Sequence, residues 1–159
     1  MKTISSVEGA SLQINSYDDY QVYGKDEITI KDSGRELYGV SFETRSSFTK
    51  EFQVPGITDD EGLVTIRLMA GANGYVSLNV DDYMLINNEY FRGNFSDATY
   101  TKGVAFFRTE KWSGAKNEQP KAVTTFTPLG VKTYLDYIRI QMKRNLQAYG
   151  DPYTFFRSL

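Results

Sequence analysis

The chain has 159 residues, enough for one compact domain with a sizeable core but too few for two ordinary domains. Its 18 basic and 20 acidic residues give a net charge of -2, which excludes an overall positive field of the kind that attracts nucleic acid. It contains no cysteine and no histidine, so disulfides, thiolate zinc sites, a cysteine nucleophile and an imidazole general base are all excluded within it.

Hydropathy gives no sign of a membrane segment. The first residues, Met1–Glu8, lack the apolar run of a signal peptide, and no stretch approaches the roughly 20 apolar residues of a membrane span. We therefore expect no membrane span, and we expect that an export signal, if the protein has one, was removed or lies outside this sequence.

Apolar and polar side chains alternate in two early segments, residues 27–31 and 48–54, although Lys50 interrupts the second. The 12 tyrosines and 10 phenylalanines also favour pleated sheets, where rings pack across strands, over a helical bundle. Both segments are therefore expected to be strands with one buried side.

Two longer alternating runs, residues 64–70 and 75–80, are separated by the sequence Gly-Ala-Asn-Gly. Asn-Gly tolerates the positive φ angles of a tight turn between paired strands. We therefore expect residues 64–80 to form a β-hairpin.

Further strand candidates are residues 104–109, 123–127 and 134–142. In the last of these, the residues expected on one face are Ile138, Ile140 and Met142, and those on the other are Tyr137, Arg139 and Gln141. Residues 83–100 are less regular, and 112–120 are rich in turn-forming residues, so long connections between sheets are expected in both.

Eight or more short strands without a helical period predict an all-β fold, an antiparallel two-sheet sandwich of the jelly-roll or galactose-binding-like type. We expect residues 1–145 to form this sandwich. Residues 146–159 are expected to be an extension that leads toward a following domain.

Two acidic turns, Asp59–Glu61 and Asp81–Asp82, hold carboxylates that could bind Ca²⁺ or act as the acid and base of a glycosidase. Neither has the spacing of an EF-hand, and solvated turns explain both. We therefore expect no catalytic residue, no metal and no cofactor in this chain.

Tyr100 and Trp112 are the candidate ligand contacts, because both stand in loop-like sequence and a flat ring can stack on the apolar face of a sugar. Packing in the core is the competing interpretation. Phe106 and Phe107 are less suitable, since one of two adjacent residues in a strand must face inward.

Arg139, Lys143 and Arg144 form a short basic group near the end of the last predicted strand. Such a group could meet phosphate, lipopolysaccharide or an acidic neighbouring domain. A solvated strand end is the simpler interpretation.

Two stretches, taken in order, resemble one protein family. The sequence SGRELYGVSF at Ser33–Phe42 resembles the small-Gly-Arg-Glu segment of PorU-type sortases, which are gingipain-related cysteine peptidases of the type IX secretion system of Bacteroidota. The sequence YLDYIRIQMKRNL at Tyr134–Leu146, followed by Phe155–Arg157, is similar to the Tyr-Leu-Asp-Tyr-Ile and Phe-Arg run of that family. The resemblance covers nearly the whole chain, but Leu37 stands where Trp is common, and Asn79–Asp82 replaces a turn of the Asn-x-Asn-Gly kind.

In that family the catalytic Cys and His lie in a peptidase domain after this region. The resemblance therefore implies a non-catalytic scaffolding domain that packs on a following peptidase domain of the same polypeptide, at the cell surface. It also implies that the parent removes C-terminal sorting signals from secreted cargo, transfers the cargo to lipopolysaccharide, and meets other secretion-system proteins.

Two alternatives remain open. A carbohydrate-binding module of an exported protein would present Tyr100 and Trp112 to a glycan. An adhesin or phage-tail module would also suit a tyrosine-rich sandwich of nearly neutral charge.

Overall fold

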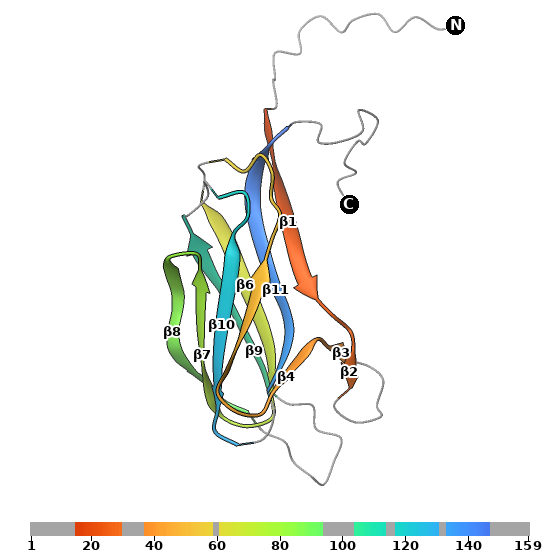
Figure 1. Cartoon of the computed structure of the whole chain (residues 1–159), viewed down its shortest axis with the longest axis vertical. Coiled ribbons are helices and arrows are strands. Elements are labelled where there is room, and N and C mark those ends of the chain that lie inside the picture. Colours follow the sequence, from red (N-terminus) through yellow and green to blue (C-terminus); the bar gives the residue numbers. More distant parts are fainter. Residues whose placement is uncertain are drawn as a thin grey trace, which may run out of the picture.

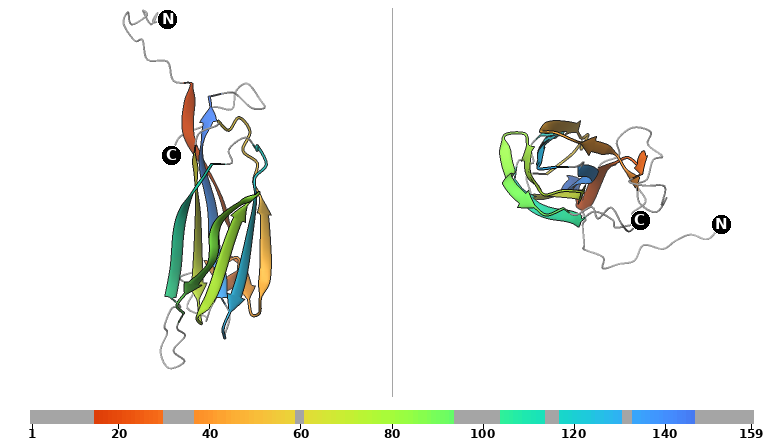
Figure 2. Two further views of the ribbon diagram at one scale, coloured as in Figure 1. Left: turned by 90° about the vertical axis from the view of Figure 1, so that its left-hand side faces the viewer. Right: turned by 90° about the horizontal axis from the view of Figure 1, so that it is seen from below.

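The computed structural model of the chain describes residues 15–29, 37–58, 61–93, 104–113, 117–130 and 133–146. Every helix or strand within these segments is a β-strand, and the strands form two antiparallel sheets that face each other (Figure 1, Figure 2). No helix able to cross a membrane occurs in these segments. The expected all-β fold is confirmed, while the expected extension of residues 146–159 lies, except for Leu146, outside the described residues.

The strands follow the chain in this order: β1 (Ser16–Gly24), β2 (Ile28–Thr29), β3 (Leu37–Tyr38), β4 (Val40–Phe42), β5 (Ser46–Glu51), β6 (Gly62–Ala70), β7 (Gly74–Val80), β8 (Tyr83–Phe91), β9 (Val104–Trp112), β10 (Lys121–Pro128) and β11 (Thr133–Asn145). The first sheet has the order β1-β11-β6-β9, with β4 paired to one end of β11, and the second has the order β5-β10-β7-β8. Most successive long strands thus pass from one sheet to the other, as in a jelly roll, while β7 and β8 are neighbours in the second sheet.

The core lies between the two sheets and is filled by every second residue of the central strands. In β11 the side chains of Ile138, Ile140 and Met142 are buried, as their alternation predicted. Aromatic rings join the two layers, since Phe42 of β4 stacks on Phe126 of β10 with ring centroids 4.1 Å apart. Burial of these apolar side chains is the main stabilising contribution to the fold.

The predicted hairpin of residues 64–80 is wrong. β6 pairs with β11 and β9 in the first sheet, and β7 pairs with β10 and β8 in the second, so the Gly-Ala-Asn-Gly sequence carries the chain from one sheet to the other. Neither Asn73 nor Gly74 has a positive φ, so the turn expected for Asn-Gly is not formed. Gly74 is needed for close packing instead, because an added Cβ would lie 2.6 Å from Cζ of Phe91 and 2.9 Å from the carbonyl oxygen of Thr127.

Gly74→Ala is therefore expected to destabilise the domain by roughly 1–3 kcal/mol, the usual cost of overpacking a tight site. Urea denaturation would measure the change. Gly24→Ala is the matched control, because a Cβ there meets its nearest atoms at 3.6 Å and should change the stability by less than about 1 kcal/mol. Equal losses for the two variants would contradict this account of Gly74.

The true partner of β7 is β8, a strand in a segment that the sequence left irregular. A two-residue turn, Asp81–Asp82, joins them, and Asp81 takes a φ of 51°. Asn88 has a φ of 47°, and the register shifts between Val76 and Asn79, so the alternation of β8 is broken by bulges.

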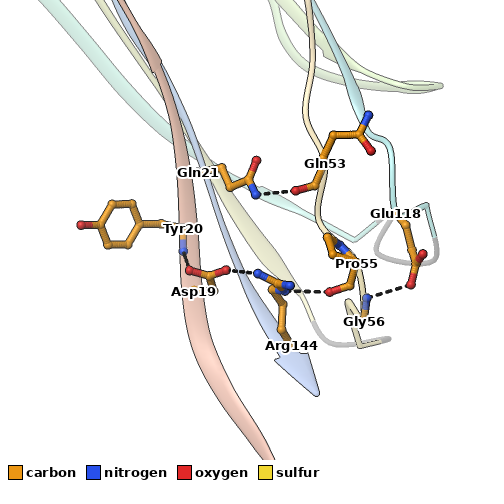
Figure 3. Close-up of polar contacts among 8 residues, drawn as sticks. All are labelled: Asp19, Tyr20, Gln21, Gln53, Pro55, Gly56, Glu118 and Arg144. Carbon is orange, nitrogen blue, oxygen red and sulfur yellow. Dashed lines mark hydrogen bonds and ion pairs between the residues drawn. The ribbon is translucent and has the colours of Figure 1, made fainter. Parts of the chain in front are cut away.

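A buried arginine ties together one end of the sandwich (Figure 3). Arg144, at the end of β11, is only 4% exposed, donates from Nε to the carbonyl oxygen of Pro55 at 2.7 Å, and pairs with the carboxylate of Asp19 on β1. Glu118 accepts a hydrogen bond from the backbone N–H of Gly56 at 2.7 Å. Residues from β1, β11 and two loops are thus held together by charge-assisted hydrogen bonds.

The basic group expected at the end of the last strand is therefore divided between two faces. Arg144 points inward, because it is buried and lies against the ring of Tyr17, its neighbour on β1. Arg139 and Lys143 lie on the outer side of the same strand. A single patch of three cations is not formed.

Candidate functional site

The outer face of the first sheet carries the largest group of exposed apolar side chains at aligned positions. Adjacent outward residues are Tyr20 and Gln141, then Val22 and Arg139, on β1 and β11. β6 continues these rows with Leu63 and Thr65, and β9 with Lys111 and Thr109. The face is thus built from four strands that are far apart in the sequence.

One end of this outer face is covered by the chain itself. Tyr38 of β3 packs on Tyr134 of β11, with ring centroids 5.7 Å apart, and both contact Met69 of β6 in a small buried cluster to which Ile28 of β2 adds. The sheet therefore already serves as a packing surface on both sides at this end.

Beyond β2 and β3 no other described part of the chain packs on this face, and we call this part the open face. Its large apolar side chains are half-exposed: Tyr20 is 57% exposed, Val22 50%, Leu63 36% and Phe107 49%. Tyr20 and Val22 are neighbours on β1, whereas Gln141 separates Tyr20 from Leu63, and Phe107 lies on β9 at the opposite edge of the sheet. Single exposed apolar residues are common on soluble proteins, but several on one face of a sheet make that face a candidate interaction surface.

The charges around the open face are mostly neutralised. Arg67 pairs with Asp136, and the ammonium group of Lys111 lies 2.9 Å from a carboxylate oxygen of Glu61. That hydrogen bond with Glu61, together with its negative charge, raises the pKa of Lys111. Both cations therefore have a carboxylate partner.

Arg139 differs from these two cations. Its one hydrogen bond within the described residues runs from Nη2 to the hydroxyl of Thr65 at 3.5 Å, and its Nε is buried without a partner. Thr65 is itself buried and shares a hydrogen bond of 2.9 Å with Thr109. The centre of the open face is thus a half-buried guanidinium group with unused donors.

The outer face of the second sheet is more polar. Ser47 and Thr125 share a hydrogen bond of 3.1 Å, and Tyr75 and Tyr90 form an edge-to-face pair with centroids 5.5 Å apart. Tyr83 and Met84 are exposed at the start of β8. This face offers hydroxyls and two tyrosine rings but fewer aliphatic side chains.

The prediction that Trp112 contacts a ligand is wrong, because its side chain is completely buried. β9 runs on to Trp112, three residues past the predicted strand end, and turns the indole into the core opposite Gly62. An added Cβ at Gly62 would lie 3.1 Å from the indole ring, so glycine is needed there for the ring to fit. Tyr100, the other candidate contact, lies outside the described residues.

The structure also describes the two adjacent phenylalanines of β9 and part of the two acidic turns. Phe106 is buried and Phe107 is half-exposed, as the alternation of adjacent strand residues predicted. Asp81 accepts hydrogen bonds from the backbone N–H of Lys121 and the side chain of Asn117, so this carboxylate stabilises a turn. Asp59 and Asp60 lie outside the described residues, and within those residues no three acidic side chains gather at a metal-binding distance.

Comparison with known proteins shows a fold similar to part of a much larger protein. No protein-family description matches the chain, and no curated protein matches it. The structure of dimeric latent PorU from Porphyromonas gingivalis matches with a TM-score of 0.66 and 19% identity, over 88% of this chain and 14% of that one. At this identity the likeness shows a shared fold and nothing finer.

Carbohydrate-binding modules are also among the matched structures. A family 35 module from Clostridium thermocellum matches with a TM-score of 0.45 and 12% identity, over 80% of this chain and 98% of that one. The C-terminal module of LamC from Zobellia galactanivorans matches with a TM-score of 0.39 and 13% identity, over 79% and 98% of the two chains. The chain is thus a two-sheet β-sandwich, a fold that it shares with part of PorU.

Proposed function

We propose that this chain is a non-catalytic accessory domain of a cell-surface sortase of the type IX secretion system, and that it acts by docking on a following peptidase domain. The open face carries this proposal, because the exposed side chains of Tyr20, Val22, Leu63 and Phe107, spread over one face of the first sheet, are suited to packing against another protein. A fold shared with a part of PorU, together with the two motifs that resemble its family, supports the same function.

The test uses the purified chain and the complete protein from which it comes. The complete protein is expected to contain a peptidase domain with a catalytic Cys and His, and to cleave peptides derived from the C-terminal signals of secreted cargo. The purified chain, which contains neither residue, is expected to cleave none of them. A complete protein without a peptidase domain, or turnover by the chain alone, would refute the proposal.

A carbohydrate-binding function is the second candidate, and it is favoured by one observation on the second sheet. The rings of Tyr75 and Tyr90 lie together on a face that also presents the hydroxyls of Ser47 and Thr125. Calorimetric titration with common polysaccharides would measure carbohydrate binding by the chain, and Tyr90→Ala is expected to abolish that binding. Absence of heat with every polysaccharide, or binding that Tyr90→Ala leaves unchanged, would remove this candidate.

A further inference from the structure

Arg139 occupies the centre of a row of outward side chains that crosses all four strands of the first sheet. Val22 of β1 lies opposite it on one side, and Thr65 of β6 lies opposite it on the other, followed by Thr109 of β9. Because Val22, Thr65 and Thr109 are short, Arg139 has the longest side chain of this row.

The bonding of this guanidinium group is incomplete. Arginine has five N–H donors, and within the described residues Arg139 uses one of them, in a long contact of 3.5 Å with Thr65, while its buried Nε meets no acceptor there. A buried donor without an acceptor costs stability, and a charged donor costs more. An acceptor supplied from outside the chain would remove that cost.

The rows on either side of Arg139 hold apolar and aromatic side chains together with the polar side chains of Gln141, Arg67 and Lys111. Tyr20 and Leu63 flank it in one direction, and Phe107 lies one row away in the other. Protein interfaces concentrate their binding energy in aromatic side chains and arginine, surrounded by contacts that exclude water. The open face has this composition, and β2 and β3 already pack on its continuation at Tyr134 and Met69.

We propose that the open face docks on a protein surface that presents a carboxylate, surrounded by apolar side chains, to the guanidinium group of Arg139. This proposal adds the chemistry of the docking surface to the proposed function. It rests on the proposed function only for the identity of the partner. Paired carboxylate and guanidinium groups form two parallel hydrogen bonds, which would use donors for which the described residues supply no acceptor.

A second copy of this chain does not fit the same role. Two open faces brought together would place one Arg139 near the other, while Asp136 and Glu61 are already paired with Arg67 and Lys111, and Asp18 lies opposite Lys143 on the outer side of β1. Like charges without a counter-charge oppose association. A partner that brings its own carboxylate avoids this repulsion.

Hydroxyl-radical footprinting tests the proposal by comparing the isolated chain with the protein isolated from its natural source with its complexes intact. Tyr20, Leu63 and Phe107 are expected to react in the isolated chain and to be protected severalfold in the native protein. Tyr83 and Met84 are exposed on the other sheet and are expected to react equally in both, which makes them internal controls. Equal reactivity of both faces in the native protein would overturn the proposal.

Arg139→Gln tests the anchoring role of the guanidinium group. Loss of a charge-assisted hydrogen bond should weaken docking by about tenfold or more, so the protection of Tyr20 and Phe107 should be lost. Arg108→Gln is the matched control, because Arg108 is an exposed arginine that pairs with Glu89 away from the open face, and protection should survive. The melting temperature of the isolated chain should not fall with Arg139→Gln, since no described carboxylate loses a partner. Protection that persists in Arg139→Gln would contradict the proposal.

The results of these experiments can refute the docking surface and the proposed function independently of each other. Protection of the open face in a native protein that has no peptidase domain would refute the sortase assignment and support the docking surface. A peptidase domain without protection of the open face would support the assignment and refute the docking surface.

Discussion

Replacing Ile138 with aspartate is expected to leave the domain unfolded at room temperature. Ile138 lies at the centre of β11, is completely buried, and faces Ile66 across the strands. An unpaired carboxylate at this position has no described polar partner, and its burial costs several kcal/mol, which is comparable to the whole stability of a small domain.

Circular dichroism and thermal unfolding would measure the effect of Ile138→Asp. Leu68→Asp should behave alike, because Leu68 is equally buried on β6. Val22→Asp is the matched control: its side chain is half-exposed beside Arg139, and its melting temperature should change little. A folded Ile138→Asp variant with the parent melting temperature would show that the inward faces are assigned incorrectly.

Arg144→Ala is expected to lower the free energy of unfolding by about 3–5 kcal/mol, the cost of breaking a buried ion pair by removing one partner. The substitution leaves Asp19 without its cation and the carbonyl oxygen of Pro55 without its donor. Since these groups connect β1 to β11 and to the loop after β5, the loss should spread to the packing of β1. Urea denaturation would measure the change.

Arg108→Ala is the control for Arg144→Ala. Arg108 forms an ion pair with Glu89 at the edge of the sandwich, where its side chain is 45% exposed, and such pairs contribute about 0–1 kcal/mol. A double-mutant cycle with Asp19→Ala would then isolate the coupling between Asp19 and Arg144. Equal losses for the two arginine variants would contradict a stabilising role for the Arg144 cluster.

The strands could be predicted where one side of each strand is buried, because the alternation then follows the pleat. β11 is the clearest example, with Ile138, Ile140 and Met142 inside. β8 could not be predicted in this way, since the positive φ of Asn88 and the nearby register shifts break its period. The pairing of β6 with β7 was also predicted wrongly, because two consecutive alternating strands give the same pattern whether they lie in one sheet or in two.

The ligand site could be predicted far less well. Trp112 precedes a sequence rich in Gly, Ser and Asn, which suggested a loop, yet β9 continues through it and buries the indole against Gly62. The open face was not predicted, although the alternation of Tyr20 and Val22 in β1 was a visible signal. Its central feature, Arg139 between Val22 and Thr65, depends on pairings between strands far apart in the sequence, and a single sequence does not give their register.

The resemblance to PorU-type sortases agrees with the fold that the chain shares with part of PorU. Ser33–Glu36 of the first motif lie outside the described residues, while Tyr38 and Tyr134, one from each motif, pack on each other in the cluster at the covered end of the outer face. Packing thus brings these described parts of the two motifs together.

Site-specific photo-cross-linking is the most direct test of the claim that this domain works by docking through the open face. A photoreactive phenylalanine would replace Phe107 on the open face in one variant and Tyr83 on the other sheet in a second, each in the complete native protein. We expect position 107 to cross-link to an apolar segment that lies outside this chain and contains an acidic residue, and to lose that cross-link with Arg139→Gln. Position 83 should give no cross-link. Equal cross-linking from the two positions, or a cross-link from position 107 that is indifferent to Arg139→Gln, would contradict the claim.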